Sequence, residues 1–362
     1  MVRCAFICGL IVATLAGCQE VPPCTTQVAV ESSPAALATA PARFAMDAVP
    51  TDASTYPYNH ASNIAEMPNG DLLVVWAAGT KEAAADTVIV GSRRRKGETA
   101  WSVPTVLSEN AGKGHANPVL FVDDWGVVRL FYSELIGVGH LCLSNIQART
   151  SADHGVTWSA PRSVIDDLCL LMRNKPLILN TGEWLLPVYW EAIFQSRFWV
   201  SKDRGQSWKS RGTIITFPST NLQPAVAQCF DGSLVVLMRN GSDTGFTWEA
   251  RSQNCGGPWQ TKERHDLPNP GSALDLIRLQ SGHLLLICNP STTERTPLAA
   301  RVSADNGKIW SVPRVIEEGQ PQLSYPSVIQ TSDGTIHVSY SHRLTHIQHA
   351  EFTVAWLLST GP

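Results

Sequence analysis

The sequence contains repeats, and polar residues that could bind a sugar recur at the equivalent position of successive repeats. Proline often lies in or near the same short segments. These polar residues comprise hydrogen-bond donors, one cation and a His/Tyr pair: His60, Asn117, Lys175, Gln223, Asn269 and Tyr325. A carboxylate, Asp275, follows Asn269 at short distance. Such a set suits a polar, anionic sugar, because these groups can bond both hydroxyls and a carboxylate. The alternative is that polar side chains and proline simply end a strand at each place.

A repeated turn predicts the elements that position these residues. Glycine precedes an apolar run at six places: Gly70, Gly126, Gly182, Gly232, Gly282 and Gly334. A glycine turn into such a run is typical of a β-hairpin. The spacing of about 50 residues accommodates four short strands, which is one propeller blade. We therefore predict an all-β, six-bladed β-propeller whose inner strands bring the polar positions together around a central channel.

A second repeat has the form Ser-x-Asp-x-Gly-x-x-Trp. Complete copies begin at Ser151, Ser201 and Ser303; a variant with Asn254 begins at Ser252, and a stretched copy runs from Ser92 to Trp101. We expect the Asp to accept hydrogen bonds from turn amides and from the Ser hydroxyl, the Gly to take a positive φ, and the Trp to pack between sheets. These boxes are predicted to be scaffolding on the rim, away from the mouth of the channel.

The second repeat resembles the Asp-box (BNR) repeat. Over about residues 55–355 the chain resembles the sialidase superfamily, especially its bacterial BNR-repeat branch. The resemblance implies a site in which three arginines grip a carboxylate, a Tyr helped by a Glu is the nucleophile, and an Asp is the acid/base. Asp boxes also occur in propellers that are not sialidases, so they do not settle the activity.

Three residues match this catalytic set in order and in blade context. Arg239 matches the second arginine, Arg295 the third, and Tyr325 the nucleophile. His60 stands where the first arginine is expected, and Gln223 stands at the place of the Glu. A neutral amide cannot take the phenolic proton, and a phenol that keeps its proton is a poor nucleophile at neutral pH. These two departures count against strict sialic acid specificity.

The acid/base is the least defined part of this site. Residues 79–86 offer Glu82 and Asp86, and neither aligns cleanly with the Asp of the family. The sequence predicts an exo-acting hydrolase that removes a terminal acidic sugar, with sialidase the nearest named activity. Two alternatives stay open: a polysaccharide lyase on uronic-acid glycans, in which His60 or Tyr325 takes the proton α to the carboxylate, and a non-catalytic glycan-binding lipoprotein.

The first residues have the pattern of an export signal. Arg3 precedes an apolar stretch too short to span a bilayer, and small residues precede Cys18. This resembles a bacterial lipobox, which implies cleavage before Cys18, its acylation and a membrane anchor; the alternative is a plain secretory signal. We therefore expect a signal peptide at 1–18, a flexible tether at 19–45 and the propeller at 46–362.

Cysteine content and charge limit the remaining partners. In an oxidising compartment the plausible disulfides are Cys142–Cys169 and Cys229–Cys255, with buried free thiols as the alternative. No cysteine spacing indicates a zinc site, so no metal or other cofactor is expected. The net charge of −3 and the lack of a basic stripe argue against nucleic acid. We expect a monomer that acts on glycans.

Overall fold

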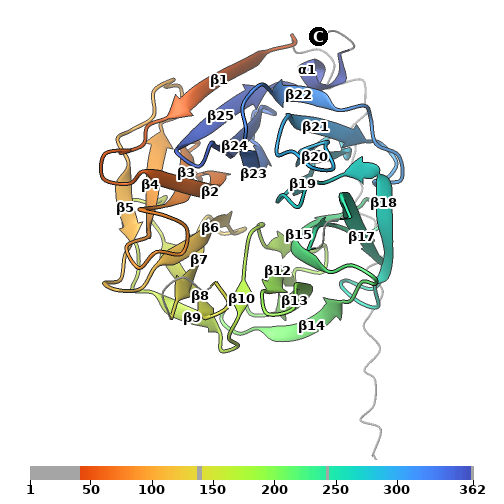
Figure 1. The fold of residues 1–362 in the computed structure, drawn as a ribbon, viewed down its shortest axis with the longest axis horizontal. Coiled ribbons are helices and arrows are strands. Elements are labelled where there is room, and N and C mark those ends of the chain that lie inside the picture. The colour runs from red at the N-terminus through yellow and green to blue at the C-terminus, as the bar shows by residue number, and fades with distance from the viewer. Residues whose placement is uncertain (1–40, 137–140, 242–243, 360–362) are drawn as a thin grey trace, which may run out of the picture.

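The fold is a closed ring of sheets. The computed structural model describes residues 41–136, 141–241 and 244–359. These residues form six antiparallel sheets, each a blade placed around a common centre (Figure 1). The prediction of an all-β, six-bladed propeller is therefore confirmed.

Each blade is a hairpin meander whose first strands lie nearest the centre (Figure 1). The first three blades consist of β2 (Tyr58–Glu66), β3 (Leu72–Gly79), β4 (Val88–Arg94) and β5 (Thr105–Ser108); β6 (His115–Val122), β7 (Val128–Leu135), β8 (Ser144–Ser151) and β9 (Arg162–Ile165); and β10 (Leu170–Leu171), β11 (Leu177–Ile178), β12 (Trp184–Trp190), β13 (Gln195–Ser201) and β14 (Lys209–Ile214). The last three consist of β15 (Asn221–Gln228), β16 (Leu234–Asn240), β17 (Phe246–Ser252) and β18 (Gln260–Pro268); β19 (Asp275–Arg278), β20 (Leu284–Cys288), β21 (Leu298–Ser303) and β22 (Arg314–Glu317); and β23 (Leu323–Gln330), β24 (Ile336–His342) and β25 (His346–Phe352), completed by β1 (Phe44–Val49). The six turn glycines all have positive φ, as the repeat predicts.

The ring is closed by pairing between a strand from near the start of the chain and one from near its end. Strand β1 pairs antiparallel with β25, from Phe44 opposite Phe352 to Val49 opposite Ile347. The sixth blade thus takes its outer strand from the start of the chain. A short helix, α1 (Val354–Leu358), follows β25, and its N-cap residue is Thr353, whose side chain accepts a hydrogen bond from the Trp356 amide.

The apolar cores lie between neighbouring blades. Six buried clusters each combine residues of two adjacent blades; for example, one joins Ile64 and Val74 of the first blade to Val49 and Ile347 of the sixth. Each sheet therefore buries both faces against its neighbours, so a blade depends on the ring for its stability.

The Asp boxes have the expected scaffolding geometry. The Ser151 hydroxyl donates to Asp153 at 2.6 Å, and the Gly155 and Thr157 amides donate to Ser151 and Asp153 at 2.8 and 2.9 Å. The tryptophans of the boxes pack in the clusters between blades. Ser151 pairs with Val128, which pairs with the last residue of β6, so the boxes lie at the end of the ring where the inner strands finish.

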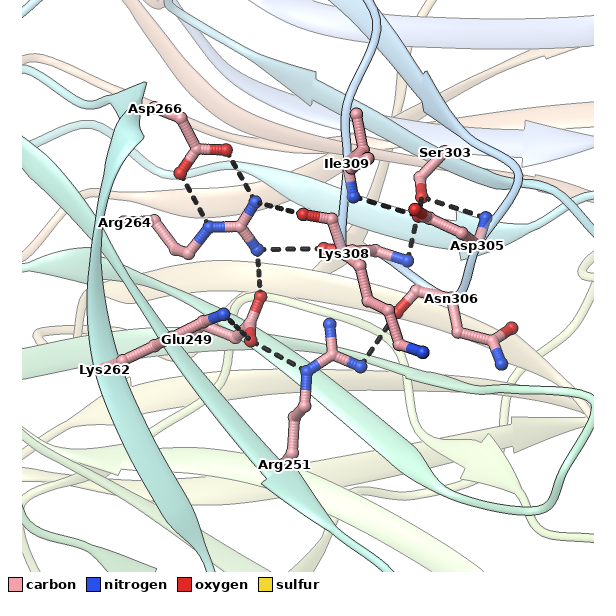
Figure 2. A network of polar contacts seen from close by, with 11 residues as sticks. Glu249, Arg251, Lys262, Arg264, Asp266, Ser303, Asp305, Asn306, Lys308 and Ile309 are labelled. Atoms are coloured by element: carbon pink, nitrogen blue, oxygen red, sulfur yellow. Dashed lines mark hydrogen bonds and ion pairs between the residues drawn. The ribbon is translucent and has the colours of Figure 1, made fainter.

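A buried ion network fastens the fourth blade to the Asp box of the fifth (Figure 2). Glu249 is 1% exposed and accepts from Arg264, and from Arg251 at 2.7 Å. Arg264 also donates to the Gly307 carbonyl at 2.8 Å, and Arg251 donates to a carbonyl of the same box. One carboxylate therefore orients two guanidinium groups that hold a loop of the next blade.

One of the two expected disulfides is present and the other was wrong. Cys142 and Cys169 are bonded, which links the loop after β7 to the start of the third blade. Cys229 is a buried free thiol in the cluster between blades four and five, whereas Cys255 is in a disulfide and packs between blades three and four. The two side chains lie in different interfaces between blades, so their closeness in the sequence does not bring them together in the fold.

The predicted signal peptide, Cys18 and most of the tether lie outside the described residues. Strand β1 begins at Phe44, two residues before the expected start of the propeller. In the described part of the chain, no helix combines the length and apolar character needed to cross a membrane.

Candidate active site

Bulges near the starts of inner strands create the site. The pairing of β2, β6, β15 and β23 with their neighbours shifts register near the start of each strand. A residue with positive φ lies in each shift: Ala61, Asn117, Gln223 and Tyr325. Such a bulge re-aims its side chain and carries backbone strain that the surrounding structure must support. Three of these four residues are sequence-predicted site residues, and they come from three different blades.

The Tyr325 hydroxyl is the centre of the site. Arg239 Nη1 donates to its Oη at 3.0 Å, and Gln223 Nε2 donates at 3.2 Å. Arg239 Nη1 also donates to Gln223 Oε1 at 3.3 Å, which fixes the amide with its nitrogen toward Tyr325. Both contacts are donors, so they can stabilise negative charge that develops on the phenol oxygen.

The polar network continues from Gln223 to the second blade. Gln223 Nε2 lies 3.5 Å from the hydroxyl of Tyr189, which accepts from Asn117 Nδ2 at 3.0 Å. Tyr189 is the next-to-last residue of β12 and is 1% exposed. The structure thus brings Asn117, Gln223, Arg239 and Tyr325 together, as the sequence predicted, through a tyrosine that the sequence analysis did not select.

A buried arginine supports the Tyr325 bulge. Arg173 is 1% exposed and its Nη2 donates to the carbonyls of Tyr325, Pro326 and Ser62 at 2.6, 2.9 and 3.1 Å. Its guanidinium carbon lies 5.3 Å from the centre of the Tyr325 ring. Burial lowers the pKa of Arg173, opposed by Asp275. The sequence analysis selected Lys175 but not Arg173, because only the fold shows that Arg173 reaches carbonyls of the sixth blade.

Arg295 completes the cationic side of the site. Its guanidinium carbon lies 5.8 Å from the centre of the Tyr325 ring. Arg295 Nη2 donates to the Gly271 carbonyl at 3.0 Å and Nη1 donates to Gln322 Oε1 at 3.4 Å. Burial lowers the pKa of Arg295, while Tyr325 opposes this shift. Arg239 and Arg295 are both partly exposed and both lie beside Tyr325, so they can bind an anionic ligand there.

His60 is neutral and its ring packs against the ring of Tyr325, the candidate nucleophile. Its ring centre lies 4.2 Å from that of Tyr325, and its Nδ1 lies 2.9 Å from the Ser341 hydroxyl. The pKa of His60 is well below its ordinary value because of burial first and then the nearby Arg173, Arg295 and Arg239. The substitution of His for the expected arginine therefore removes a positive charge and places a neutral base beside Tyr325.

Two carboxylates, Glu82 and Glu191, interact electrostatically near Arg239, and the sequence analysis selected only Glu82. Glu82 is exposed, after β3, and Glu191 is half-buried, directly after β12. Burial raises the pKa of Glu191; Arg239 opposes the shift and Glu82 adds to it. A signal existed, since Glu191 follows the second strand of its blade much as Arg239 ends the second strand of the next. The Glu191 backbone amide donates to the carbonyl of disulfide-bonded Cys169 at 3.0 Å.

The other predicted residues lie apart from the Tyr325 hydroxyl. Asp86 is exposed and accepts from the Thr80 hydroxyl at 3.0 Å within its own loop. Asn269 is fully buried and bonds both backbone groups of Ser272, at 2.9 and 3.1 Å, so its amide shapes a turn.

Lys175 and Asp275 form a second polar group farther along the channel. Lys175 Nζ donates to Ser327 at 2.6 Å and lies 3.8 Å from Asp275 Oδ2. Burial lowers the pKa of Lys175 to about 8, opposed by Asp275. Both residues line a cavity of about 290 Å³ together with Gln228 and Arg278, which lie at the far ends of β15 and β19. The predicted ring is thus divided between two levels of the channel.

The family follows from comparison with known proteins. The BNR repeat-like domain model matches residues 70–338. The chain belongs to the BNR repeat-like domain family. Its predicted place in the sialidase and BNR-repeat superfamily is confirmed.

Relatives of this BNR repeat-like chain include sialidases. A sialidase from Micromonospora viridifaciens is 25% identical over 349 residues, covering 83% of this chain and 52% of the relative. The chain thus spans about half the length of this curated relative. A mutant of the NanB sialidase from Streptococcus pneumoniae superposes with a TM-score of 0.71 at 12% identity, covering 89% of this chain and 73% of that one. The intramolecular trans-sialidase from Ruminococcus gnavus, in complex with oseltamivir carboxylate, gives 0.70 at 15%, covering 86% and 97%. At these identities the solved structures show the fold alone.

Proposed function

We propose that this protein is an exo-acting glycoside hydrolase of the sialidase type that removes a terminal acidic sugar, sialic acid or a similar one, from glycans. The observation that carries the proposal is the Tyr325 hydroxyl, which receives hydrogen bonds from Arg239 and Gln223 and has Arg295 beside it. A nucleophilic oxygen and two guanidinium groups are the parts that a sugar carboxylate and its anomeric centre require.

Each residue has a definite task in this reaction. Arg239 and Arg295 bind the carboxylate, and Tyr325 Oη attacks the anomeric carbon as the bond to the leaving oxygen breaks. Since Arg239 and Gln223 both donate to Oη, the phenolic proton must pass to another group. This proton passes to solvent as Oη attacks, because the low pKa of His60 makes its imidazole a weak base and its Nδ1 is bonded to the Ser341 hydroxyl.

Glu191 is the assigned acid. A carboxyl with a raised pKa stays protonated at higher pH than an ordinary one and can protonate the leaving oxygen. In the second half of the reaction its carboxylate accepts a proton from water, which attacks the anomeric carbon and releases Tyr325. Glu82 contributes the like charge that helps to keep Glu191 protonated.

A second candidate is a lyase acting on uronic-acid glycans. The neutral Gln223 at Tyr325 Oη and the neutral His60 beside it favour this candidate. In a lyase, Arg239 and Gln223 would neutralise the sugar carboxylate, and His60 or Tyr325 would remove the α proton as the glycosidic bond breaks by elimination.

One product screen separates these functions. The protein is incubated with sialylated and with uronic-acid glycans, and products are identified by mass spectrometry and ultraviolet absorbance. Free sialic acid or a similar acidic sugar supports the hydrolase, and unsaturated products support the lyase. Tyr325→Phe should abolish the reaction, whereas Tyr56→Phe should retain it, because Tyr56 packs against the core between the first and sixth blades. Glycan binding without turnover would refute both and leave a non-catalytic binding protein.

We further propose export and anchoring through a lipid on Cys18, with the propeller acting on glycans as a monomer. In that case Cys18→Ser shifts the protein from the membrane fraction to the soluble exported fraction. An unchanged distribution between the two fractions would contradict the anchor.

A further inference from the structure

A second group of chemically active side chains lies at the seam where the ring closes. His337 on β24 and His349 and Glu351 on β25 place their ligand atoms within 4.8 Å of one another. Both histidines are buried, at 5% and 0% exposure. His337 pairs with Ile329 near the end of β23, whereas Tyr325 lies near its start. This seam cluster, defined as His337, His349 and Glu351, is therefore separate from the candidate active site.

The closing strand fixes the orientation of His349. Asp47 on β1 lies 2.6 Å from His349 Nδ1, and a carboxylate at that position accepts the Nδ1 proton. His349 Nε2 is then unprotonated, and it faces His337 Nδ1 at 3.1 Å. A carboxylate that holds the far nitrogen of an imidazole is the usual outer partner of a metal-binding histidine, because it sets the tautomer and raises the basicity of the ligand nitrogen.

Glu351 supplies an anionic oxygen beside this pair. Its Oε2 lies 3.6 Å from His337 Nδ1 and accepts from Arg94 Nη2 at 2.6 Å. The same oxygen faces both groups, so Glu351 either shares Oε2 between Arg94 and an ion or rotates to keep Arg94 on one oxygen and turn the other toward the ion. His337 and Glu351 also line a cavity of about 250 Å³, together with Arg94 and Asp333, which provides a route of entry from solvent.

We propose that the seam cluster binds one divalent ion of the zinc type, through His337 Nδ1, His349 Nε2 and a Glu351 oxygen. Two imidazoles and one carboxylate match the ligands that zinc prefers, whereas calcium and magnesium favour all-oxygen sites. Water from the cavity can take a fourth position. Binding displaces the proton on His337 Nδ1, so one proton leaves as the ion enters.

The position of the cluster gives the ion a structural task. Its ligands lie on β24 and β25, and their partners Asp47 and Arg94 lie on β1 and β4. These strands are the ones that join the sixth blade to the start of the chain and to the first blade. An ion here stabilises ring closure, because it binds the folded seam and has no matching site in the unfolded chain.

Metal titration of the full-length protein tests this site. Chelator-treated protein is titrated with Zn²⁺ by calorimetry, and Co²⁺ is added separately to record the absorption of the bound ion. We expect one ion per chain, a rise in Tm on Zn²⁺ addition, and an affinity at least ~100-fold lower in His337→Gln, which loses a direct ligand. His346→Gln is the matched control, because His346 lies outside the cluster on β25, the strand of His349 and Glu351, and this variant should bind as the wild type does.

Glu351→Gln provides a second variant at a more exposed position, should His337→Gln fail to fold. It should keep the metal-free Tm within a few degrees and lose most of the Zn²⁺-dependent rise. The proposal is overturned if the wild type shows no saturable binding of one ion, or if both folded variants bind as tightly as the His346→Gln control. Neither result bears on the reaction at Tyr325, because the two sites share no residue.

Discussion

Replacing Arg239 by alanine tests the site most directly, because this guanidinium contacts both the phenol oxygen and its amide neighbour. The change removes a charge-assisted bond of 3.0 Å to Tyr325 Oη and one of 3.3 Å to Gln223 Oε1. A hydrogen bond to a charged group contributes about 1.5–3 kcal/mol. Since about 1.4 kcal/mol corresponds to a tenfold rate change, the contact with Tyr325 alone accounts for roughly 10- to 150-fold.

The lost contact with the substrate carboxylate adds to this effect. A bidentate guanidinium–carboxylate pair is worth at least one further bond of the same kind, so we expect kcat/KM to fall by about two orders of magnitude or more. Loss of support for charge on Oη should lower kcat, and loss of the carboxylate contact should raise KM. Arg295→Ala should give a fall of similar size, mainly through KM.

The assay is steady-state hydrolysis of the glycan identified by the product screen, with thermal unfolding to check the fold. Arg278→Ala is the matched control, because Arg278 is an exposed arginine of β19 at the far end of the channel. It should retain activity within about threefold. Near-normal kcat/KM in Arg239→Ala, or an equal loss in Arg278→Ala, would refute the assignment of the site.

Three further predictions concern the acid, the ion network and the disulfide. Because the pKa of Glu191 is raised, its protonated form persists above the ordinary pH range of a carboxyl, and activity should fall as pH rises through that pKa. Glu191→Gln should lower kcat and remove this fall of activity at high pH. An unchanged pH profile in the variant would exclude Glu191 as the acid. Glu249→Gln should lower the free energy of unfolding at pH 7 by about 3–5 kcal/mol, because it removes the buried carboxylate that Arg251 and Arg264 share and leaves Arg264 only the exposed Asp266. Asp266→Asn should cost under about 1 kcal/mol, because Asp266 is exposed and Glu249 stays in place. Similar values for the two variants by urea denaturation would contradict this reasoning. Burial opposes ionisation of Glu249, but Arg251, Arg264 and Lys262 outweigh it and keep its pKa below the ordinary value, so this stabilisation is present above pH ~4.3 and lost on acidification. Reducing Cys142–Cys169, with a sequence separation of 27, should cost about 3–4 kcal/mol in the same measurement, and a Cys142→Ser, Cys169→Ser double variant that is as stable as the oxidised wild type would contradict it.

The number of blades could be predicted because the signals for it are local. Each turn needs a glycine at one position, and each Asp box closes within eight residues, from Ser151 to Trp158 for example. Hydrogen bonds of this kind depend on neighbours in the chain, so they leave a pattern in the sequence. The same reasoning gave the correct blades for Arg239 and Tyr325.

Contacts between blades left no such pattern. Nothing near Arg173 indicates that it reaches carbonyls of the sixth blade, and nothing near Glu191 indicates that Arg239 and Glu82 act on its pKa. The pairing of Cys229 with Cys255 failed for the same reason, since the two residues are near in sequence but belong to different interfaces.

The sequence by itself determined the repeat, the six-bladed ring and the blades that carry Tyr325 and its two arginines, because hairpins and Asp boxes are built from adjacent residues. Only the tertiary structure decided which side chains meet. It placed Gln223 and Arg239 on the Tyr325 hydroxyl, made His60 neutral by burial, moved Lys175 and Asp275 to another level, and gathered the seam cluster. The physical reason is that register, bulges and ring closure set distances between residues more than 100 positions apart, and charge and burial act through those distances.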